Sequence, residues 1–280
     1  MNLINAKRKQ LTLDGFCLIE NVLDEAILTA TTSLVDQKVA SIDASHRRTQ
    51  KSTGSMIGSD ALPELVDLFV WPAALDILKS LGCGDSRFWS AYLINKPAHS
   101  PQLFWHQDCI MWDDPRAYSD RAPMLFLMYY LTDTSRENGC LRVLPGTHRK
   151  RHLLHQLIPV AHTDEVRRMD APDNPIYGAF EGEIDVPVKA GDLVLGDARL
   201  FHASHPNQTD RDRTVITIWF HPWYDDLCEE TQAWITHNGR KMHEGWPHEA
   251  LDRLMPVLGD YQGDQPPMKP QRIPGRELVQ

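Results

Sequence analysis

Short segments rich in β-branched and aromatic residues follow one another through the middle of the chain, with turn residues between them. Segments of this length and spacing are typical of β-sandwiches, jelly rolls and barrels. They predict a mainly β core over about residues 86–222. The eight segments are RFWSAYLIN (87–95), QLFWHQD (102–108), MLFLMYYL (124–131), LRVL (141–144), EIDVPV (183–188), DLVLG (192–196), RLFHAS (199–204) and RTVITIWF (213–220).

Helices are predicted on both sides of this β-rich region. After a short strand at 15–20, apolar residues recur at helical spacing behind Asp24, which is a suitable N-cap. A second helical stretch covers 63–82 and is interrupted at Pro72, and a further helix is expected near 247–258. We therefore expect α-helices flanking the β core.

Three regions lack periodicity. Residues 43–60 are polar and predict a loop. Residues 145–182 form a connection so long that a lid or binding loop is favoured. The tail after Gly259 is proline-rich and is expected to be extended or flexible. All 280 residues are assigned to one domain, with an N-terminal region at 11–85, the core, and a C-terminal helix and tail at 223–280.

The charge balance argues against a nucleic acid or a membrane as partner. The net charge is −9 and the sequence pI is about 5.8, so no general attraction to polyanions is expected. The basic run at residues 148–152 is the local exception. It is interpreted either as a solvated surface stretch, which we favour, or as a site for an anionic ligand.

Cysteine usage and apolar runs predict a cytoplasmic protein. The five cysteines are scattered and include no C-x-x-C, so neither a disulfide framework nor a zinc ribbon is indicated. The first residues contain no apolar signal-peptide core, and the apolar run at 124–131 is too short to span a bilayer as a helix. The oligomeric state is left open, a homodimer included.

The tripeptide His106-Gln107-Asp108 is the central chemical feature of the sequence. In a strand, residues two apart point to the same side, which would bring an imidazole and a carboxylate to one metal ion. With one more imidazole, these residues make a two-histidine, one-carboxylate face that leaves three positions open on Fe(II). Taken alone the tripeptide is weak, because a chain with 13 histidines can contain it by chance as a hydrogen-bonded pair.

The third ligand is expected on the segment RLFHASHPN, which contains His202 and His205. The two histidines have opposite strand parity, so at most one faces the metal in regular geometry. His202 lies within the strand pattern, whereas His205 precedes the turn residues at 206–207. A ligand on a rigid strand is better positioned, which favours His202.

Arg213 begins the next apolar strand, RTVITIWF. An arginine at the start of a buried strand requires an anionic partner, and its planar guanidinium suits a carboxylate. That partner is either the carboxylate of a cosubstrate or an acidic residue of the chain. Arg211 is the alternative gripping residue.

These segments together resemble the phytanoyl-CoA dioxygenase family of Fe(II)/2-oxoglutarate-dependent oxygenases. The resemblance covers roughly residues 11–225 and implies a double-stranded β-helix, which is a jelly-roll, cupin-like core, with flanking helices. It implies iron ligands at His106, Asp108 and His202, and a 2-oxoglutarate arginine at Arg213. The matching segments are GFCLIENVL, LINKP, FWHQD, RENGCLRVLPGTH, AGDLVLGDARLFHASHPN and the arginine strand.

The resemblance implies three weaker assignments as well. Asn95 matches a position that contacts 2-oxoglutarate in related hydroxylases, Trp112 matches an aromatic residue that lines the reaction pocket, and Ser135 is a candidate hydroxyl donor to 2-oxoglutarate. A strand-end turn residue and a core tryptophan are the structural alternatives for Asn95 and Trp112.

One position departs from the family pattern. Related enzymes often carry a serine two residues after the arginine, where this chain has Val215. Thr214 or Thr217 would then supply the hydroxyl, or none does. Relatives that halogenate their substrate have a small residue in place of the carboxylate ligand, which makes room for a halide ion. This chain has Asp108 at that position, which argues against halogenation.

Two arginines in the loop 109–123, Arg116 and Arg121, are candidates to meet an acidic group of the substrate, and ordinary surface arginines are the favoured alternative. The remaining chemistry-bearing residues show no ligand spacing and are interpreted as surface or hydrogen-bonded histidines: His148, His152, His155, His162, His221, His237, His243 and His248.

The sequence thus predicts an enzyme that uses Fe(II), 2-oxoglutarate and O₂ to hydroxylate an unactivated C–H bond of a small metabolite or natural-product intermediate, releasing succinate and CO₂. The first alternative is a cupin-type metalloenzyme that does not use 2-oxoglutarate. The second is a catalytically inactive binding protein on the same fold.

Overall fold

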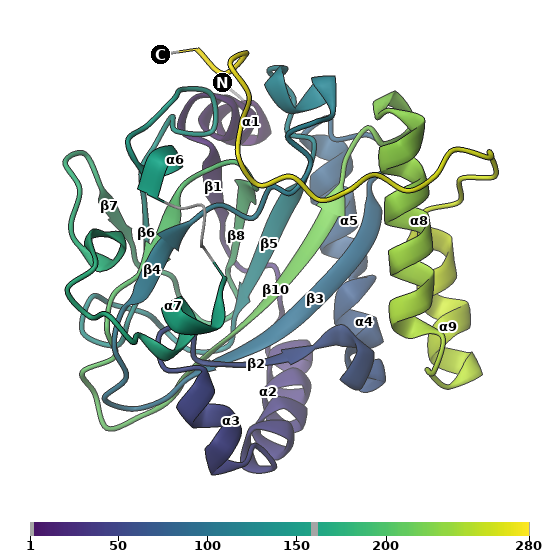
Figure 1. Cartoon of the computed structure of the whole chain (residues 1–280). Helices are drawn as coiled ribbons and strands as arrows, with labels where there is room; N and C mark the ends of the chain where they lie inside the picture. The colour runs from purple at the N-terminus through teal and green to yellow at the C-terminus, as the bar shows by residue number, and fades with distance from the viewer. Residues whose placement is uncertain (1–2, 158–161, 280) are drawn as a thin grey trace.

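The computed structural model describes residues 3–157 and 162–279 (Figure 1). Within them the strands form two antiparallel sheets, one ordered β1-β8-β5-β10-β3-β2 and the other β4-β9-β6-β7. This arrangement, with its flanking helices, confirms the predicted mainly β, jelly-roll fold class. The strands are β1 (Phe16–Ile19), β2 (Ser55–Gly58), β3 (Arg87–Lys96), β4 (Leu103–His106), β5 (Leu125–Tyr130), β6 (Leu141–Val143), β7 (Ile184–Val186), β8 (Leu193–Asp197), β9 (His202–Ser204) and β10 (Arg213–His221).

Strand alternation divides the interior into two apolar layers, which β5 illustrates. Its residues Leu125, Leu127 and Tyr129 pack into the core between the large sheet and the helices. The intervening Phe126 and Met128 face the small sheet and share a second core with side chains of β6 and β7. All six residues of β5 are buried, as expected for a strand covered on both faces.

Helices cover the outer face of the large sheet, as the sequence predicts. Asp24 caps the helix that follows β1, and its carboxylate accepts a hydrogen bond from the Ile27 backbone N–H at 3.0 Å. The helices are α1 (Leu3–Asp14), α2 (Glu25–Ala40), α3 (Ala44–Thr49), α4 (Val66–Phe69), α5 (Pro72–Ser80), α6 (Leu154–Leu157), α7 (Asp164–Arg168), α8 (Glu229–His243) and α9 (His248–Leu254). Short 3-10 helices lie at Ser59–Ala61, Pro63–Leu65, Pro115–Tyr118, Pro175–Tyr177, Tyr224–Asp226 and Met255–Val257. No helix in the described ranges is long and apolar enough to cross a membrane.

The structure corrects the prediction of a loop at residues 43–60. Asp43 caps α3, and β2 adds to the edge of the large sheet by pairing with β3. Polar composition concealed both elements, because an edge strand and a surface helix need few apolar residues. Two further helices, α1 and α8, had no counterpart in the sequence analysis.

Two segments cover the small sheet and the open end between the sheets (Figure 1). The first, which we call the lid segment, is residues 145–157 and 162–182, and it contains α6 and α7. The second, the C-terminal tail after Gly259, is extended as predicted and attached by backbone hydrogen bonds. Gln271 donates to the Ile110 carbonyl at 2.7 Å, and Trp112 donates to the Gln271 carbonyl at 3.2 Å. These contacts bring the far end of the chain to the region that follows β4.

Candidate active site

His106 and His202 lie directly opposite each other on neighbouring strands, since they are paired residues of β4 and β9. Their ring centroids are 4.1 Å apart. The sequence analysis had placed Asp108 in a strand covering residues 102–108. In the structure Asp108 lies outside the strand, because β4 ends at His106. The Asp108 backbone N–H instead donates to the Ala198 carbonyl at 2.8 Å. That hydrogen bond turns the chain and holds the carboxylate beside both imidazoles.

The two imidazoles present free ring nitrogens to the Asp108 carboxylate. His106 Nε2 lies 3.6 Å from Oδ1 and His202 Nε2 lies 3.7 Å from Oδ2. Both histidines direct Nδ1 at the carbonyl two residues earlier, at 3.1 Å from Phe104 and 3.0 Å from Leu200. A carbonyl can only accept, so Nδ1 carries the proton and Nε2 keeps a lone pair. This tautomer is the one that binds a metal through Nε2.

Burial keeps these donors in the form that a metal requires. The exposed fractions of His106, Asp108 and His202 are 6%, 7% and 2%. Burial lowers the pKa of His106 to about 3, with His202 as the next cause and Asp108 acting in the opposite direction. The His106 ring is therefore neutral at physiological pH.

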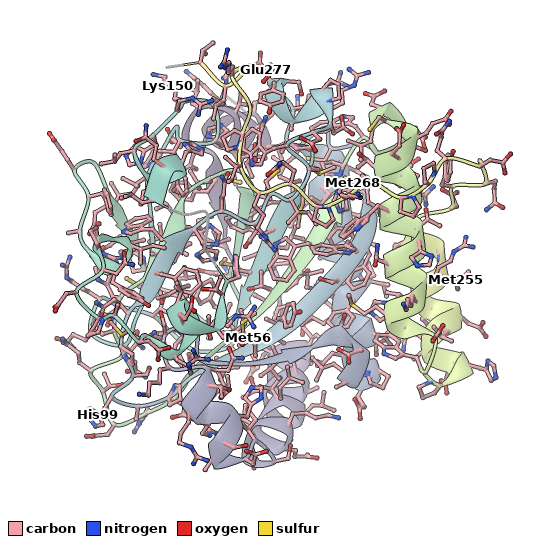
Figure 2. All side chains as sticks on the ribbon, in the orientation of Figure 1. Met56, His99, Lys150, Met255, Met268 and Glu277 are labelled. Carbon is pink, nitrogen blue, oxygen red and sulfur yellow. The ribbon has the colours of Figure 1, made fainter. Side chains whose placement is uncertain are left out.

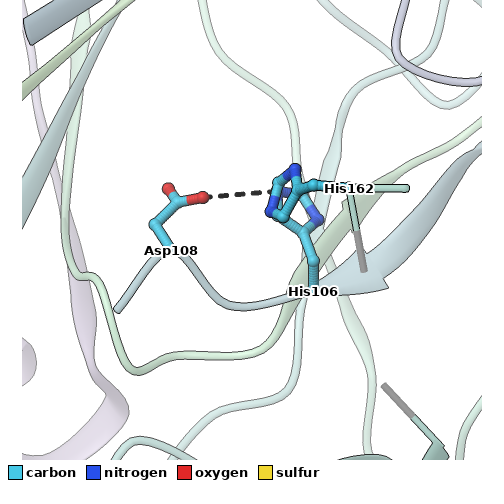
Figure 3. Close-up of side chains that lie close together, drawn as sticks. All are labelled: His106, Asp108 and His162. Carbon is cyan, nitrogen blue, oxygen red and sulfur yellow. Dashed lines mark ion pairs between the residues drawn. The ribbon is translucent and has the colours of Figure 1, made fainter. Parts of the chain in front are cut away.

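His162, which the sequence analysis grouped with surface or hydrogen-bonded histidines, lies against the same site (Figure 3). Its ring meets His106 edge-on with centroids 4.9 Å apart. The His162 Nε2 is buried without a hydrogen-bond partner. His106, Asp108 and His162 each offer one possible ligand atom, and these three atoms lie within 4.8 Å of one another. No spacing in the sequence indicated this contact, because His162 reaches the site from the lid segment.

Strand β10 forms one wall of the cavity beside these residues. Every second residue of its first part, Arg213, Val215, Thr217 and Trp219, lines the cavity, whose volume is about 180 Å³. At the end of this series the Trp219 Nε1–H donates to Asp108 Oδ2 at 2.9 Å. The indole therefore orients the carboxylate, as partners of metal ligands do.

Arg213 is buried with unused hydrogen-bonding capacity. Its Nη2 donates to the Gly139 carbonyl at 2.8 Å, while its Nε is buried without a partner. Burial lowers the pKa of the guanidinium, and the phenol of Tyr130 is the nearest group that raises it. The Thr217 hydroxyl is likewise buried without a partner, whereas the Thr214 hydroxyl accepts from Asn95 at 3.1 Å. Of the two threonines, Thr217 thus has a hydroxyl available to a ligand.

The structure does not bring Asn95, Trp112 and Ser135 to the cavity. Asn95 points to the opposite face of β3 from the lining residue Ile94, and its amide oxygen accepts from Arg47 at 3.0 Å. The buried Trp112 ring packs against Tyr118 at 5.4 Å. Ser135 is exposed in a turn, and its backbone N–H donates to Asn138 at 2.7 Å.

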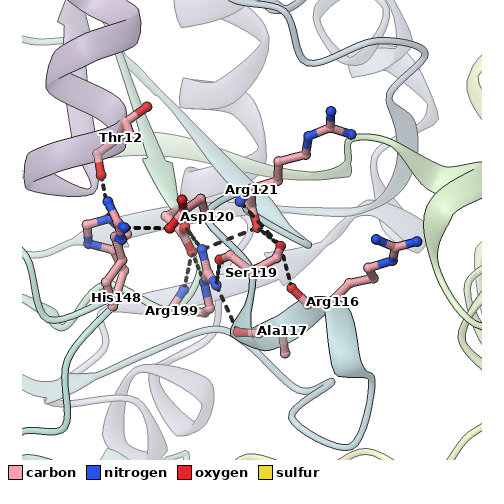
Figure 4. Close-up of polar contacts among 10 residues, drawn as sticks. Thr12, Arg116, Ala117, Ser119, Asp120, Arg121, His148 and Arg199 are labelled. Carbon is pink, nitrogen blue, oxygen red and sulfur yellow. Dashed lines mark hydrogen bonds and ion pairs between the residues drawn. The ribbon is translucent and has the colours of Figure 1, made fainter. Parts of the chain in front are cut away.

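Arg116 and Arg121 lie beside Ser119 and Asp120 (Figure 4). Both are exposed, and neither lines the cavity. Arg116 Nε donates to the Asp226 carbonyl at 2.8 Å, and Arg121 forms an ion pair with the Asp226 carboxylate at 3.0 Å. The basic run is also dispersed: the buried His148 contacts the Thr12 carbonyl, and Arg149 pairs with Asp120. Neither group forms the anion site that the sequence left open.

His205, the alternative third ligand, faces a different acidic residue. Its Nε2 lies 2.5 Å from Asp185 Oδ1, and Asp185 also pairs with Arg136 at 3.1 Å. Cys140 lies close enough to complete a second group of potential ligands. Because the carboxylate already has two cationic or hydrogen-bonding partners, this group is explained as an ion-pair network.

Comparison with known proteins identifies the family. A family model described as Phytanoyl-CoA dioxygenase (PhyH) matches residues 11–215. The chain belongs to this family. Phytanoyl-CoA dioxygenase 1 of Oryza sativa subsp. japonica is 29% identical over 147 residues, which cover 52% of this chain and 48% of the rice protein. The chain spans about half the length of the curated relatives it matches.

Solved structures share the phytanoyl-CoA dioxygenase fold over nearly the whole chain. The non-heme alpha ketoglutarate dependent carbocyclase SnoK from nogalamycin biosynthesis is 21% identical, with a TM-score of 0.60 over 94% of this chain and 95% of SnoK. The epimerase SnoN, solved with Fe3+, alpha ketoglutarate and nogalamycin RO, is 19% identical, with a TM-score of 0.59 over 97% of each chain. At these identities the likeness establishes the fold.

The sequence analysis did not assign most of the lining residues to the site, among them Trp219, His162, Arg167 and Arg272. Trp219 could have been found, because it stands six residues after Arg213 and shares its strand parity. His162, Arg167 and Arg272 had no such signal. They come from the lid segment and the C-terminal tail, which have no periodicity to show which way a side chain points.

Proposed function

We propose that this protein is an Fe(II)/2-oxoglutarate-dependent dioxygenase that hydroxylates an unactivated C–H bond of a small metabolite or natural-product intermediate, with release of succinate and CO₂. The observation that carries the proposal is the approach of two Nε2 lone pairs, from His106 and His202, to the two oxygens of Asp108 at 3.6 and 3.7 Å. Membership of the phytanoyl-CoA dioxygenase family supports it.

The three side chains fit a ferrous ion. At 3.6 and 3.7 Å the donor atoms are too far apart for hydrogen bonds. Two donors that each lie about 2.1 Å from a shared ion are about 3–4 Å apart. Buried imidazole and carboxylate donors in this two-to-one ratio are the set used by non-haem iron oxygenases. His106, Asp108 and His202 would hold the iron.

Arg213 and Thr217 fit the carboxylate of 2-oxoglutarate. The buried guanidinium has no acidic partner among the ion pairs of the described residues, and both its Nε and the Thr217 hydroxyl lack hydrogen-bond partners. A buried cation without an anion is costly, so an anionic ligand satisfies both groups at once. Fork-shaped donation to a carboxylate is the geometry for which arginine is suited.

The bound iron and cosubstrate supply the activation of dioxygen and the oxidation of the C–H bond. The protein contributes orientation and exclusion of water. Trp219 holds the Asp108 carboxylate through its indole N–H, and the tautomers of His106 and His202 are set by backbone carbonyls. Apolar side chains around the cavity position the substrate away from bulk water: Met56, Trp89, Ile94, Leu103, Phe104, Met124, Met128 and Leu141.

Anaerobic titration of the metal-free protein with Fe(II) and then 2-oxoglutarate tests the proposal. We expect a weak visible charge-transfer band, and succinate release once O₂ is admitted. Asp108→Ala should abolish both. Arg213→Ala should raise the concentration of 2-oxoglutarate needed for the band about 10- to 100-fold, because charged hydrogen bonds are lost. Arg211→Ala is the matched control and should behave as wild type.

His162 favours one rival, a cupin-type metalloenzyme that does not use 2-oxoglutarate. As a fourth protein ligand it would leave two open positions on a six-coordinate ion, too few for a bidentate cosubstrate and dioxygen together. The rival predicts that His162→Ala abolishes metal binding and that no charge-transfer band forms. The oxygenase predicts that this variant still binds both Fe(II) and 2-oxoglutarate.

A further inference from the structure

The mouth of the cavity carries two arginines that the proposed chemistry does not use. Arg167 lies on α7 of the lid segment, and Arg272 lies on the C-terminal tail (Figure 2, where Met268 and Glu277 mark the course of the tail). Backbone hydrogen bonds fix both segments. Ser52 donates to the Arg167 carbonyl at 2.9 Å, and Gln271, next to Arg272, donates to Ile110 at 2.7 Å. Two segments distant in sequence thus place guanidiniums at one opening.

Neither arginine has an acidic partner among the described residues. The Nε of Arg167 is buried without a hydrogen-bond partner, and Arg272 is exposed at the mouth with no ion pair in the described part of the chain. The neighbouring Arg168 differs, because it pairs with Asp170 at 2.7 Å. The one carboxylate among the described lining residues is Asp108.

The charges within the cavity do not balance these two arginines. Under the proposed function, on which this step rests, ferrous iron and Arg213 together offset the charges of Asp108 and of 2-oxoglutarate. Asp108 is then fully engaged by the metal. Arg167 and Arg272 remain as uncompensated cations beside a largely apolar cavity, and an uncompensated cation in such a place needs an anionic partner.

We propose that Arg167 and Arg272 form a binding site for an anionic group of the substrate, a carboxylate or a phosphate, while the apolar body of the substrate extends toward the iron ligands. Guanidinium groups recognise both kinds of oxyanion by paired hydrogen bonds. Trp89, Phe104 and Met128 on the cavity wall match an apolar body. The substrate class is therefore an amphipathic organic anion.

Four probes with one phenylethyl body test the head-group preference: 3-phenylpropanoate, 2-phenylethyl phosphate, 3-phenylpropanamide and 2-phenylethylamine. Binding is followed by quenching of tryptophan fluorescence, since Trp89 and Trp219 line the cavity. It is measured on protein loaded with Fe(II) and 2-oxoglutarate under argon, and also on metal-free protein. We expect the carboxylate or the phosphate to bind at least about tenfold tighter than the amide, and the amine to bind weakest. The ratio of carboxylate to phosphate affinity distinguishes the two head groups.

Arg167→Gln and Arg272→Gln should each reduce the preference for the anion, and the double variant should remove it, without changing the affinity for 2-oxoglutarate. Arg168→Gln on α7 and Arg276→Gln on the tail are matched controls, because neither arginine lines the cavity; Arg168 is half-buried and Arg276 is exposed. Melting temperatures establish that each variant is folded.

Equal binding of the amide and the anions, an unchanged preference in the double variant, or failure of both anions to bind would overturn the proposal. The metal-free arm separates it from the proposed function. Anion preference on metal-free protein without any charge-transfer band on loading would contradict the oxygenase assignment and leave the anion site intact. A normal charge-transfer band without anion preference would support the oxygenase assignment and contradict the anion site.

Discussion

The cavity has a wall and a cover, and the two are built differently. The wall consists of β10 and the β4–β9 pair, where strand pairing determines the direction of the side chains, with one irregularity between Leu103 and His106. The cover consists of the lid segment, which packs through a small apolar cluster against β4 and β9, and the C-terminal tail, which is attached by a few backbone hydrogen bonds. Groups that need precise geometry for a metal and a cosubstrate lie on the wall. Groups proposed to select a substrate lie on the cover, where sequence can change at little structural cost.

The largest effect should come from a change in the wall at the third metal ligand. His202→Ala removes one of the two Nε2 donors that approach Asp108, and it should lower iron affinity and succinate release by more than about 100-fold, because even partners of metal ligands contribute 10- to 100-fold. Calorimetric titration with Fe(II) measures the first quantity and succinate quantification the second.

His205→Ala is the matched control, three residues further along the same segment. It breaks the pair between the buried His205 and Asp185 and should lower stability by about 1–3 kcal/mol. Iron affinity should stay as in wild type. If the two variants exchange these phenotypes, the assignment of His202 as the third ligand is wrong.

A smaller effect is expected where the wall orients a ligand without touching the metal. Trp219→Phe deletes the indole N–H that donates to Asp108 at 2.9 Å and should lower iron affinity about 10- to 100-fold. Trp89→Phe is the control, because its indole nitrogen is buried without a partner on the same cavity wall. Iron titrations of the two variants should differ, and equal losses would mean that ring packing rather than the hydrogen bond is responsible.

The strands of the wall could be predicted from the sequence because they are short runs of apolar and β-branched residues between turn residues. The apolar run RTVITIWF placed Arg213 at the start of the buried strand β10, and the rigidity of a strand favoured His202 over His205. The strand at 102–108 was predicted too long, since a hydrogen bond from Asp108 to Ala198 replaces the ladder after His106. Asp108 therefore lies beside the histidines because the chain turns after His106, and not because Asp108 and His106 point to the same side of one strand.

The cover could not be predicted, because nothing local determines where its side chains point. Trp112 stands four residues after Asp108 and was a candidate for the pocket, but it is buried next to the point where Gln271 of the tail forms an isolated bridge with Met111. Arg116 and Arg121 were candidates to meet a substrate, with surface arginines as the favoured alternative, and they lie at the surface around Asp226. Only the tertiary path of the lid segment and the tail identifies His162, Arg167 and Arg272.

A moderate effect is expected for the hydroxyl that replaces the missing serine of the family pattern. Thr217→Val keeps the shape of the side chain and removes the unpartnered hydroxyl that lines the cavity. Loss of one hydrogen bond to a charged carboxylate should raise the KM for 2-oxoglutarate about tenfold and leave kcat nearly unchanged. Steady-state kinetics at saturating iron measures both.

Thr214→Val gives the opposite result if the assignment is correct. It leaves the Asn95 amide without its acceptor and should lower the melting temperature, with no change in the KM for 2-oxoglutarate. A KM increase in Thr214→Val but not in Thr217→Val would mean that the cosubstrate contacts the face of β10 that does not line the cavity. That result would contradict the geometry of the site.

The smallest effect concerns the cover itself and its dependence on pH. Burial lowers the pKa of His155, on α6 of the lid segment, to about 4, whereas an exposed histidine titrates near about 6.5. The closed lid therefore binds fewer protons than an open one, so its stability falls as pH drops below about 6.5 and levels off near about 4. Opening should increase about fourfold between about pH 7.5 and about pH 6. Hydrogen exchange of the α6 and α7 amides, corrected for intrinsic rates, measures this change.

Replacement of the titrating ring separates local opening from global unfolding. His155→Phe keeps an aromatic ring against Phe201, 4.6 Å away in the wild type, and should remove the contribution of His155 to the pH dependence of lid exchange. A remainder is expected from the other lid histidines whose pKa values burial also lowers, which are His148, His152 and His162. His221 on β10 has its pKa lowered to about 4 as well, yet its ring can be protonated only when the sheet opens. The β10 amides should thus stay protected at a pH where the lid already exchanges, and simultaneous exchange of both regions would show that wall and cover are one cooperative unit.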